Sequence, residues 1–215
     1  MTDHVEDPGL TPPWRLIATL GGFGALAGML IVAVFAATQP AIEAYRAEVL
    51  AAAVNEVLGE PDRYDTLYVV DGVITATVPA DANPDQMDTL YVGYRNGQEV
   101  GFAIRAAGIG FQDTISLLFG YDATTSRLLG MKVLESKETP GLGDKIYKDL
   151  EFVAEFVGAE GPLTGVKPGS GTGQASEVTM ITGATISSRA IIKAINAALE
   201  RMNPLLAAYQ GGQSP

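Results

Sequence analysis

The stretch MITGATISSRAIIKAI, from Met180 to Ile195, contains the clearest structural transition in the chain. Small and hydroxyl-bearing residues come first. Apolar residues then recur at the spacing of one helix face: Ile191, Ile192, Ile195 and Leu199. This pattern predicts a helix from about Ile186 to Met202 that is entered directly from a loop.

Thr182, Gly183, Ala184 and Thr185 lie where the predicted loop becomes the helix. A threonine there is an ordinary N-cap, which stabilises a helix by about 1 kcal/mol. The first turn of a helix also has unpaired N–H groups and the positive end of the dipole, so it binds phosphate well. The small Gly183 and Ala184 would let a bulky group approach the Thr185 hydroxyl. Both explanations fit these residues, and capping is the simpler one.

A second stretch, Glu138-Thr139-Pro140-Gly141-Leu142-Gly143, joins a predicted strand to a predicted helix. Loops that follow strands and contain glycine often receive ligands. Pro-Gly is also a common turn pair, so an ordinary turn explains the stretch equally well. Neither stretch identifies a ligand by itself.

The chain before this loop has the alternation and turn residues of antiparallel strands. Asp71-Gly72 separates residues 67–70 from 73–78, and Asn96-Gly97 separates 90–95 from 99–105. Residues 115–121 and 128–134 form a third strand pair. A helix is expected over 144–157, followed by a loop rich in Gly, Pro, Ser and Thr over 158–176. The fold class is therefore α+β, an antiparallel sheet with helices packed against it.

A long uncharged segment lies near the N-terminus, from Leu16 to Ile42. About 20 apolar residues in a helix span the bilayer core, so a single transmembrane helix is expected over 14–40. A cleaved signal peptide would need a basic start and a shorter apolar run, and the acidic start of this chain disfavours it. An amphipathic helix over 41–58 would lead into a soluble domain over 41–205. Residues 1–13 and 206–215 are expected to be disordered or loose tails.

The composition excludes several kinds of site. The chain has no cysteine, and its one histidine, His4, lies in the N-terminal tail. Thiolate or histidine metal sites and a Ser-His-Asp triad are therefore not expected, and no catalytic residue is predicted. The formal net charge of −11 argues against nucleic-acid binding.

Two motifs together resemble a known family. ESKETPGLGDKI (Glu135 to Ile146) and ITGATISSRAI (Ile181 to Ile191), in this order and behind one N-terminal anchor, are similar to RnfG, the FMN-binding component of the Rnf electron-transport complex. The related NqrC component of the sodium-pumping NADH:quinone reductase has similar motifs. The resemblance covers residues from about 14 to 205.

The resemblance implies a covalent cofactor and a place in a larger complex. FMN would be joined through its phosphate to the hydroxyl of Thr185 by a flavin transferase, and Thr182, Gly183 and Ala184 would shape the loop. The second motif, Glu138 to Gly143, would lie near the isoalloxazine and phosphate. The chain would carry electrons among other membrane subunits rather than act as an enzyme by itself. It would be a single-pass protein of the bacterial inner membrane with its soluble domain in the periplasm.

The chain departs from the family pattern at two places. Thr179 stands where the family usually has an aspartate, and Glu177 is the nearest carboxylate. A Gly-Tyr-Gly-Gly type stretch is replaced by residues 108–113. Two alternatives remain: a membrane-anchored scaffold without flavin, which the missing aspartate motivates, and an FMN-binding accessory of another respiratory complex. Four aromatic residues are candidates to flank a flavin, although core packing is the simpler role for each: Tyr91, Tyr94, Phe102 and Phe111.

Overall fold

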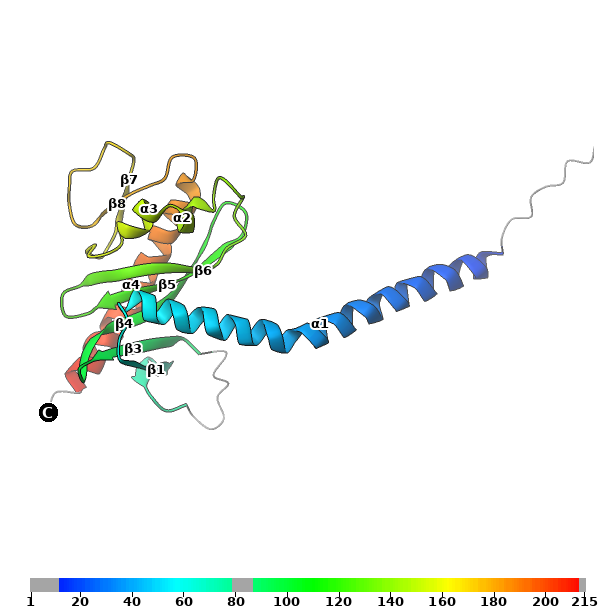
Figure 1. The fold of residues 1–215 in the computed structure, drawn as a ribbon, viewed down its shortest axis with the longest axis horizontal. Helices are drawn as coiled ribbons and strands as arrows, with labels where there is room; N and C mark the ends of the chain where they lie inside the picture. The colour runs from blue at the N-terminus through cyan, green and yellow to red at the C-terminus, as the bar shows by residue number, and fades with distance from the viewer. Residues whose placement is uncertain (1–11, 79–86, 213–215) are drawn as a thin grey trace, which may run out of the picture. The chain divides into compact units, whose positions relative to one another are not determined.

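The computed structural model describes residues 12–78 and 87–212, and the chain divides into two compact units, residues 1–48 and 49–215 (Figure 1). The second unit contains a six-stranded sheet with strand order β2-β1-β3-β4-β5-β6, in which every pairing is antiparallel. The strands are β1 Arg63–Val70, β2 Val73–Thr75, β3 Thr89–Arg95, β4 Gln98–Ile109, β5 Thr114–Asp122 and β6 Arg127–Glu135. The predicted α+β class and all three hairpins are confirmed.

The two predicted tight turns form because their residues accept positive φ angles. Asp71 and Gly72 have φ values of 49° and 77°, and Asn96 and Gly97 have 52° and 77°. Two successive residues of positive φ produce the turn whose twist matches that of the flanking strands. These turns fix the register of β1 with β2 and of β3 with β4.

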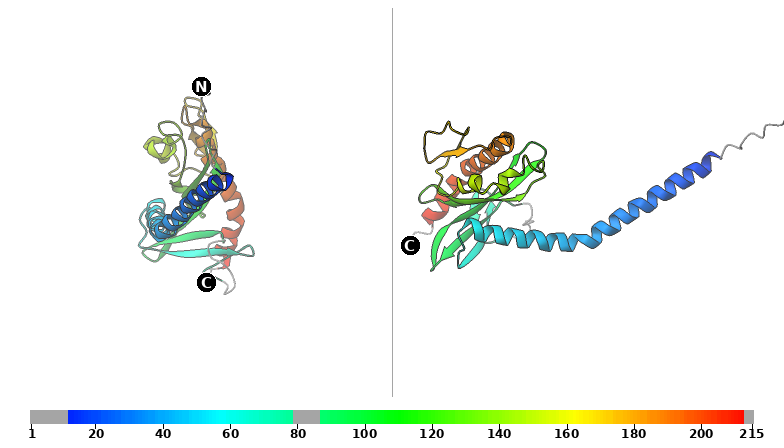
Figure 2. Two further views of the ribbon diagram at one scale, coloured as in Figure 1. Left: turned by 90° about the vertical axis from the view of Figure 1, so that its right-hand side faces the viewer. Right: turned by 45° about the horizontal axis from the view of Figure 1, so that its top comes forward.

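Helices cover both faces of the sheet, because successive residues of its central strands point to opposite sides. Phe102 and Ile104 face the core beneath α4 (Thr185–Gly212), whereas Ala103 faces the last turns of α1 (Pro13–Val57). Two views show α4 along one face of the sheet (Figure 2). A Cβ at Gly108 would lie 2.8 Å from the carbonyl oxygen of Ala190, so α4 lies directly on β4. The predicted apolar stripe of this helix is buried.

The predicted loose C-terminal tail over 206–215 is wrong as far as the structure describes it. Helix α4 continues past Met202 and through Pro204 to Gly212, and residues 213–215 lie outside the described residues. Leu206 is 1% exposed, and the ring of Tyr209 packs edge-on against Phe102. These apolar contacts stabilise the helix beyond the proline, which removes one backbone donor and crowds the carbonyl four residues earlier.

The expected helix over 144–157 is two short helices, α2 (Lys145–Lys148) and α3 (Leu150–Ala154). Asp149 separates them because its backbone is extended and its carboxylate accepts from the N–H groups of Glu151 and Phe152. The expected loop over 158–176 contains an unpredicted strand, β7 (Thr164–Val166), which pairs in parallel with β8 (Glu177–Thr179).

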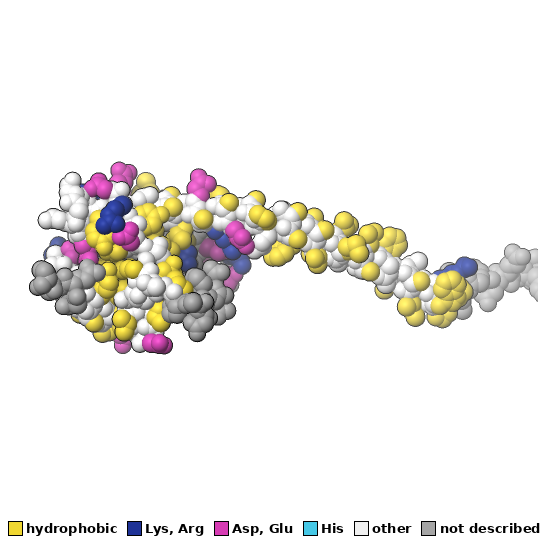
Figure 3. Space-filling view, turned by 90° about the horizontal axis from the view of Figure 1, so that it is seen from below, with side chains coloured by type: hydrophobic (Ala, Val, Ile, Leu, Met, Phe, Trp, Pro, Cys, Tyr) yellow, Lys and Arg dark blue, Asp and Glu magenta, His cyan; other side chains and the backbone are white. Residues whose placement is uncertain are grey.

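Helix α1 replaces the two helices expected over 14–40 and 41–58. It runs without a break through Pro40 and ends at Val57. By length and composition it is the one helix of the described residues that is apolar enough to cross a membrane. Its apolar side chains are visible in Figure 3, and Leu20, Phe23 and Met29 are more than 70% exposed. Most of the predicted N-terminal tail, residues 1–11, lies outside the described residues.

Candidate cofactor pocket at the start of the last helix

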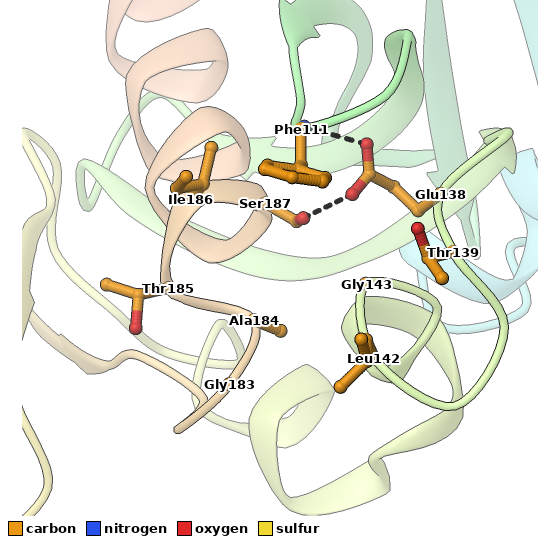
Figure 4. A pocket seen from close by; sticks show the side chains of 10 residues that line it. All are labelled: Phe111, Glu138, Thr139, Leu142, Gly143, Gly183, Ala184, Thr185, Ile186 and Ser187. Carbon is orange, nitrogen blue, oxygen red and sulfur yellow. Dashed lines mark hydrogen bonds between the residues drawn. The ribbon is translucent and has the colours of Figure 1, made fainter.

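A pocket of about 310 Å³ lies where three segments meet (Figure 4). The segments are the turn that follows β4, the loop that follows β6 and the loop that enters α4. The residues that line it are Phe111, Glu138, Thr139, Leu142, Gly143, Gly183, Ala184, Thr185, Ile186 and Ser187. Both stretches selected from the sequence therefore contribute to one site.

Seven of the ten residues predicted for the site line this pocket, and three do not. Thr182 is exposed, immediately before Gly183, whose φ of 85° turns the chain into α4. Pro140 and Gly141 belong to the loop but not to the pocket lining. Gly141 has a φ of 78°, and its N–H donates to the carboxylate of Asp144 at 2.7 Å. These three residues belong to the two loops around the pocket but do not line it.

Thr185 is the first residue of α4, and its hydroxyl donates to the carbonyl oxygen of Ile181 at 3.3 Å. An N-cap hydroxyl instead accepts from an N–H of the first turn, so the capping explanation is wrong for Thr185. The helical hydrogen-bond ladder begins with the N–H of Ser188, which donates to Ala184. The N–H groups of residues 185–187 precede that ladder, as at any helix start. The pocket is thus lined by a helix N-terminus and a hydroxyl.

After Ser187, Glu138 is the most buried polar residue that lines the pocket, and it is 6% exposed. One carboxylate oxygen accepts from the N–H groups of Phe111 at 2.8 Å and Gln112 at 3.0 Å, and the other accepts from the hydroxyl of Ser187. Burial by itself would raise the pKa of Glu138, but these hydrogen bonds outweigh it and hold the pKa below the ordinary glutamate value. Glu138 therefore connects all three segments as a carboxylate.

Two glycines make room for this carboxylate. A Cβ at Gly110 would collide with one oxygen of Glu138, and a Cβ at Gly143 would collide with the other oxygen. Neither glycine has a positive φ, so close approach rather than backbone conformation explains the absence of a side chain. Gly110, the second glycine of the stretch at residues 108–113, and Gly143, the last glycine of the loop at 138–143, thus make room for the same side chain.

Two other acids near the pocket are paired with lysines. Asp144 is almost fully buried, and the ammonium of Lys148 lies 2.6 Å from its carboxylate. Asp113 pairs with Lys137 at 3.0 Å. The hydrogen bond from Lys148 is the main cause of the low pKa of Asp144, and the N–H of Thr114 followed by Lys137 lowers the pKa of Asp113.

The pocket also includes Ile186 and Ser187, which the sequence did not assign to it, and Phe111, for which core packing was preferred over a place beside a flavin. Core packing was the favoured role of four aromatic residues, and it is correct for the buried Tyr91 and Phe102. Phe111 is 67% exposed and lines the pocket, so that expectation was wrong for it. Ile186 is an apolar residue outside the apolar stripe of α4, and this position could have indicated a ligand-facing side chain. No local sequence feature distinguishes Ser187.

The position of the family's aspartate, Thr179, does not line the pocket. Its N–H donates to the carboxylate of Glu155. Glu177 accepts from the N–H groups of Thr172 and Gly173 and from the Thr172 hydroxyl. Both nearby carboxylates are thus bonded to backbone outside the pocket.

The pocket residues fit a phosphate-bearing aromatic cofactor. The volume lies within the range typical of small-molecule sites, which are mostly apolar with a few placed polar groups. Phe111, Leu142 and Ile186 offer apolar surface, and the first turn of α4 offers N–H groups to a phosphate. No cluster of residues suited to a metal ion occurs within 12–78 and 87–212.

Residues 110–200 match the family described as FMN-binding domain, and every pocket residue lies within that range. Among solved structures, the chain is similar to Shewanella oneidensis NqrC, with a TM-score of 0.66, 16% identity and coverage of 77% of this chain and 99% of that one. At that identity the likeness shows the fold alone. It confirms the architecture of sheet and packed helices.

Curated relatives are similar over most of their length. The chain is 30% identical to the G component of the ion-translocating oxidoreductase complex of Methanosarcina acetivorans, over 86% of this chain and 92% of the relative. It is 32% identical to the corresponding component of Pseudoalteromonas atlantica, over 80% of each chain. These matches cover most of the chain, and they show that it belongs to the RnfG family, the G components of ion-translocating oxidoreductase complexes.

Proposed function

We propose that this chain is the electron-carrying RnfG component of an Rnf-type ion-translocating complex, with FMN in the pocket at the start of α4. The observation that carries the proposal is the meeting of residues 138–143 and 183–187 around one pocket within the segment that matches an FMN-binding domain. The curated relatives supply the kind of complex. The chain has no substrate of its own in this proposal.

The pocket residues would divide the work of holding the cofactor. The N–H groups of the first turn of α4 would bind the phosphate, because they are unpaired and carry the positive end of the helix dipole. The exposed side chains of Phe111, Leu142 and Ile186 would cover the ring system and exclude water from it. FMN, when bound, supplies the capacity to accept and release electrons, and the protein supplies its placement and electrostatics.

The proposal includes a phosphoester between the FMN phosphorus and Oγ1 of Thr185. Oγ1 would attack the flavin-bearing phosphorus of a flavin dinucleotide, the pyrophosphate P–O bond would break, and the hydroxyl proton would leave with the nucleoside monophosphate. The product has the mass of protein plus FMN less one water. Thr185 suits this role because its hydroxyl makes only a long hydrogen bond, at 3.3 Å, and its neighbours Gly183 and Ala184 are small. A flavin transferase would catalyse the step.

The protein would be anchored in the inner membrane of a bacterium by one span over residues 14–40, with residues 41–205 forming the periplasmic FMN-binding domain. The exposed apolar surface of α1 supports the anchor. Other membrane subunits of the complex would be the electron donor and acceptor. The names of the curated relatives, which place them in a complex, support such partners.

The intact mass of the denatured full-length chain tests the proposal. Wild type, Thr185→Ala, Thr185→Ser and Thr182→Ala would each be expressed with a flavin transferase. We expect one FMN less one water on wild type and on Thr182→Ala, and none on Thr185→Ala. Thr182 is the matched control because it is a threonine of the same loop that does not line the pocket. Thr185→Ser retains a hydroxyl and should retain at least part of the flavin.

Two results would count against this function. Unmodified mass for the wild type would favour the flavin-free scaffold, which the threonine at position 179 first suggested. Loss of flavin from Thr182→Ala with retention on Thr185→Ala would move the attachment to the other side of Gly183. In the first case the covalent attachment would fail, and in the second the assignment of Thr185 would fail.

A further inference from the structure

The charges around the pocket differ in how they are compensated. Asp113 and Asp144 each lie within 3.0 Å of a lysine ammonium, so their negative charges are largely cancelled. Within the described part of the chain, no lysine or arginine forms an ion pair with Glu138, which is also the one acid that lines the pocket. The pocket wall therefore contains one net negative charge.

In the described part of the chain, uncharged hydrogen-bond donors stabilise the Glu138 carboxylate. Two N–H groups and one hydroxyl donate to the carboxylate of Glu138, and burial removes it from water. The backbone at Gly110 and Gly143 lies close against its two oxygens, where a Cβ would collide with them. The lowered pKa of Glu138 agrees with a group that stays ionised in the folded protein.

We propose that Glu138 is an electrostatic tuning residue, a fixed and uncompensated carboxylate that makes the flavin of this pocket harder to reduce. The inference depends on the proposed binding of FMN in this pocket. Reduction by an outside one-electron donor transfers an electron into the pocket and makes it more negative. A fixed negative charge in a poorly screened environment opposes that change, so the midpoint potential is lower than it would be beside a neutral side chain.

Glu138→Gln removes the charge with little change in shape. The amide oxygen can still accept from the N–H groups of Phe111 and Gln112, and the amide nitrogen can donate to the Ser187 hydroxyl. The matched control is Glu177→Gln. Glu177 also accepts from two N–H groups and one hydroxyl, but it does not line the pocket.

The experiment is a spectroelectrochemical titration of the full-length flavinylated protein in detergent. We expect Glu138→Gln to raise the midpoint potential by about 59 mV for a one-electron step. This corresponds to a change on the order of tenfold in the oxidised-to-reduced ratio at a fixed potential. Glu177→Gln should match wild type. An unchanged potential in Glu138→Gln, or an equal rise in both variants, would overturn the tuning role.

Ser187→Ala separates charge from local structure. It removes the hydroxyl that donates to Glu138 but keeps the carboxylate, so its potential should equal or fall below that of wild type. This comparison also stands if Glu138→Gln fails to fold. A rise in Ser187→Ala would show that a disturbed pocket, not a lost charge, shifts the potential.

Mass measurement distinguishes failure of the tuning role from failure of the proposed function. Without FMN on the wild-type chain, the proposed function fails and the tuning role fails with it. If FMN is attached to wild type and to each of these variants, and all have the same midpoint potential, the proposed function stands and only the tuning role of Glu138 fails.

Discussion

Glu138 joins segments that are far apart in the sequence through a single side chain. Its contacts to Phe111 and Ser187 span 27 and 49 residues. The glycines at 110 and 143 are small because this carboxylate occupies the space that their side chains would need. At the scale of the residue, Glu138 in the loop at 138–143 has a structural role, because its hydrogen bonds connect three segments, in addition to lining the pocket.

The hydrogen bonds of Glu138 should make the free energy of unfolding decrease as the pH falls into the acidic range. The pKa of Glu138 is lowered on folding, so its contribution is fully present above the unfolded value of about 4.5 and is lost as pH falls through the folded value. At pH 7, Glu138→Gln should lower the free energy of unfolding by about 1–3 kcal/mol, because hydrogen bonds to a charged group become neutral ones.

Urea unfolding of the flavin-free chain from pH 7 to pH 3 measures this effect. The difference between wild type and Glu138→Gln should narrow below about pH 4.5. Other acids with lowered pKa, such as Asp122 and Glu177, affect both proteins alike and cancel in the difference. A difference that stays constant with pH would show that Glu138 is not ionised in the folded domain.

Helix α4 positions the pocket because its N-terminus forms one wall and its length crosses the sheet. The end of the helix is anchored as well, by Leu206 in the core and by Gln210, whose amide donates to Glu99 at 2.9 Å. Leu206→Ala should cost about 2–5 kcal/mol of stability, as for other buried leucines. Leu205→Ala, at a half-buried neighbour, should cost less. Thermal unfolding of both variants measures this cost. A negligible effect of Leu206→Ala would support the prediction of a loose tail from residue 206.

The elements that were predictable from the sequence are those with local causes. Asp-Gly and Asn-Gly turns fix two hairpins by backbone preference alone, and the isoleucine stripe of α4 repeats at helical spacing. Strands β7 and β8 have three residues each and pair across a polar loop, so their cause is tertiary. The continuation of α4 beyond Pro204 likewise depends on contacts made by Leu206 and Tyr209.

The pocket follows the same division. Glycines and threonines beside a predicted helix mark the segments at 138–143 and 182–185, and Gly141 and Gly183 are there because their φ angles are positive. Phe111 was one of four aromatic candidates with nothing local to favour it, and Ser187 looks ordinary in the sequence. Both lie in the site because Glu138 brings three segments together. Local patterns therefore located the two loops, and packing decided which of their residues line the cavity.

At the scale of the whole molecule, the proposed function requires the domain with the pocket to lie on the periplasmic side of the membrane. The flanks of the apolar segment decide this only weakly. Arg15 is the one lysine or arginine before it, and Arg46 is the first after it. Since cytoplasmic flanks are enriched in positive charge, orientation here depends on a nearly even balance.

That balance makes orientation testable with two matched variants. Alkaline phosphatase, which needs disulfides and so is active only in the oxidising periplasm, would be fused after Pro215. We expect an active fusion for wild type. Arg15→Glu should reduce the activity by shifting the positive bias to the C-terminal flank, whereas Arg46→Glu should retain or increase it. An inactive wild-type fusion that Arg46→Glu activates would instead place the domain in the cytoplasm and contradict the proposed periplasmic location.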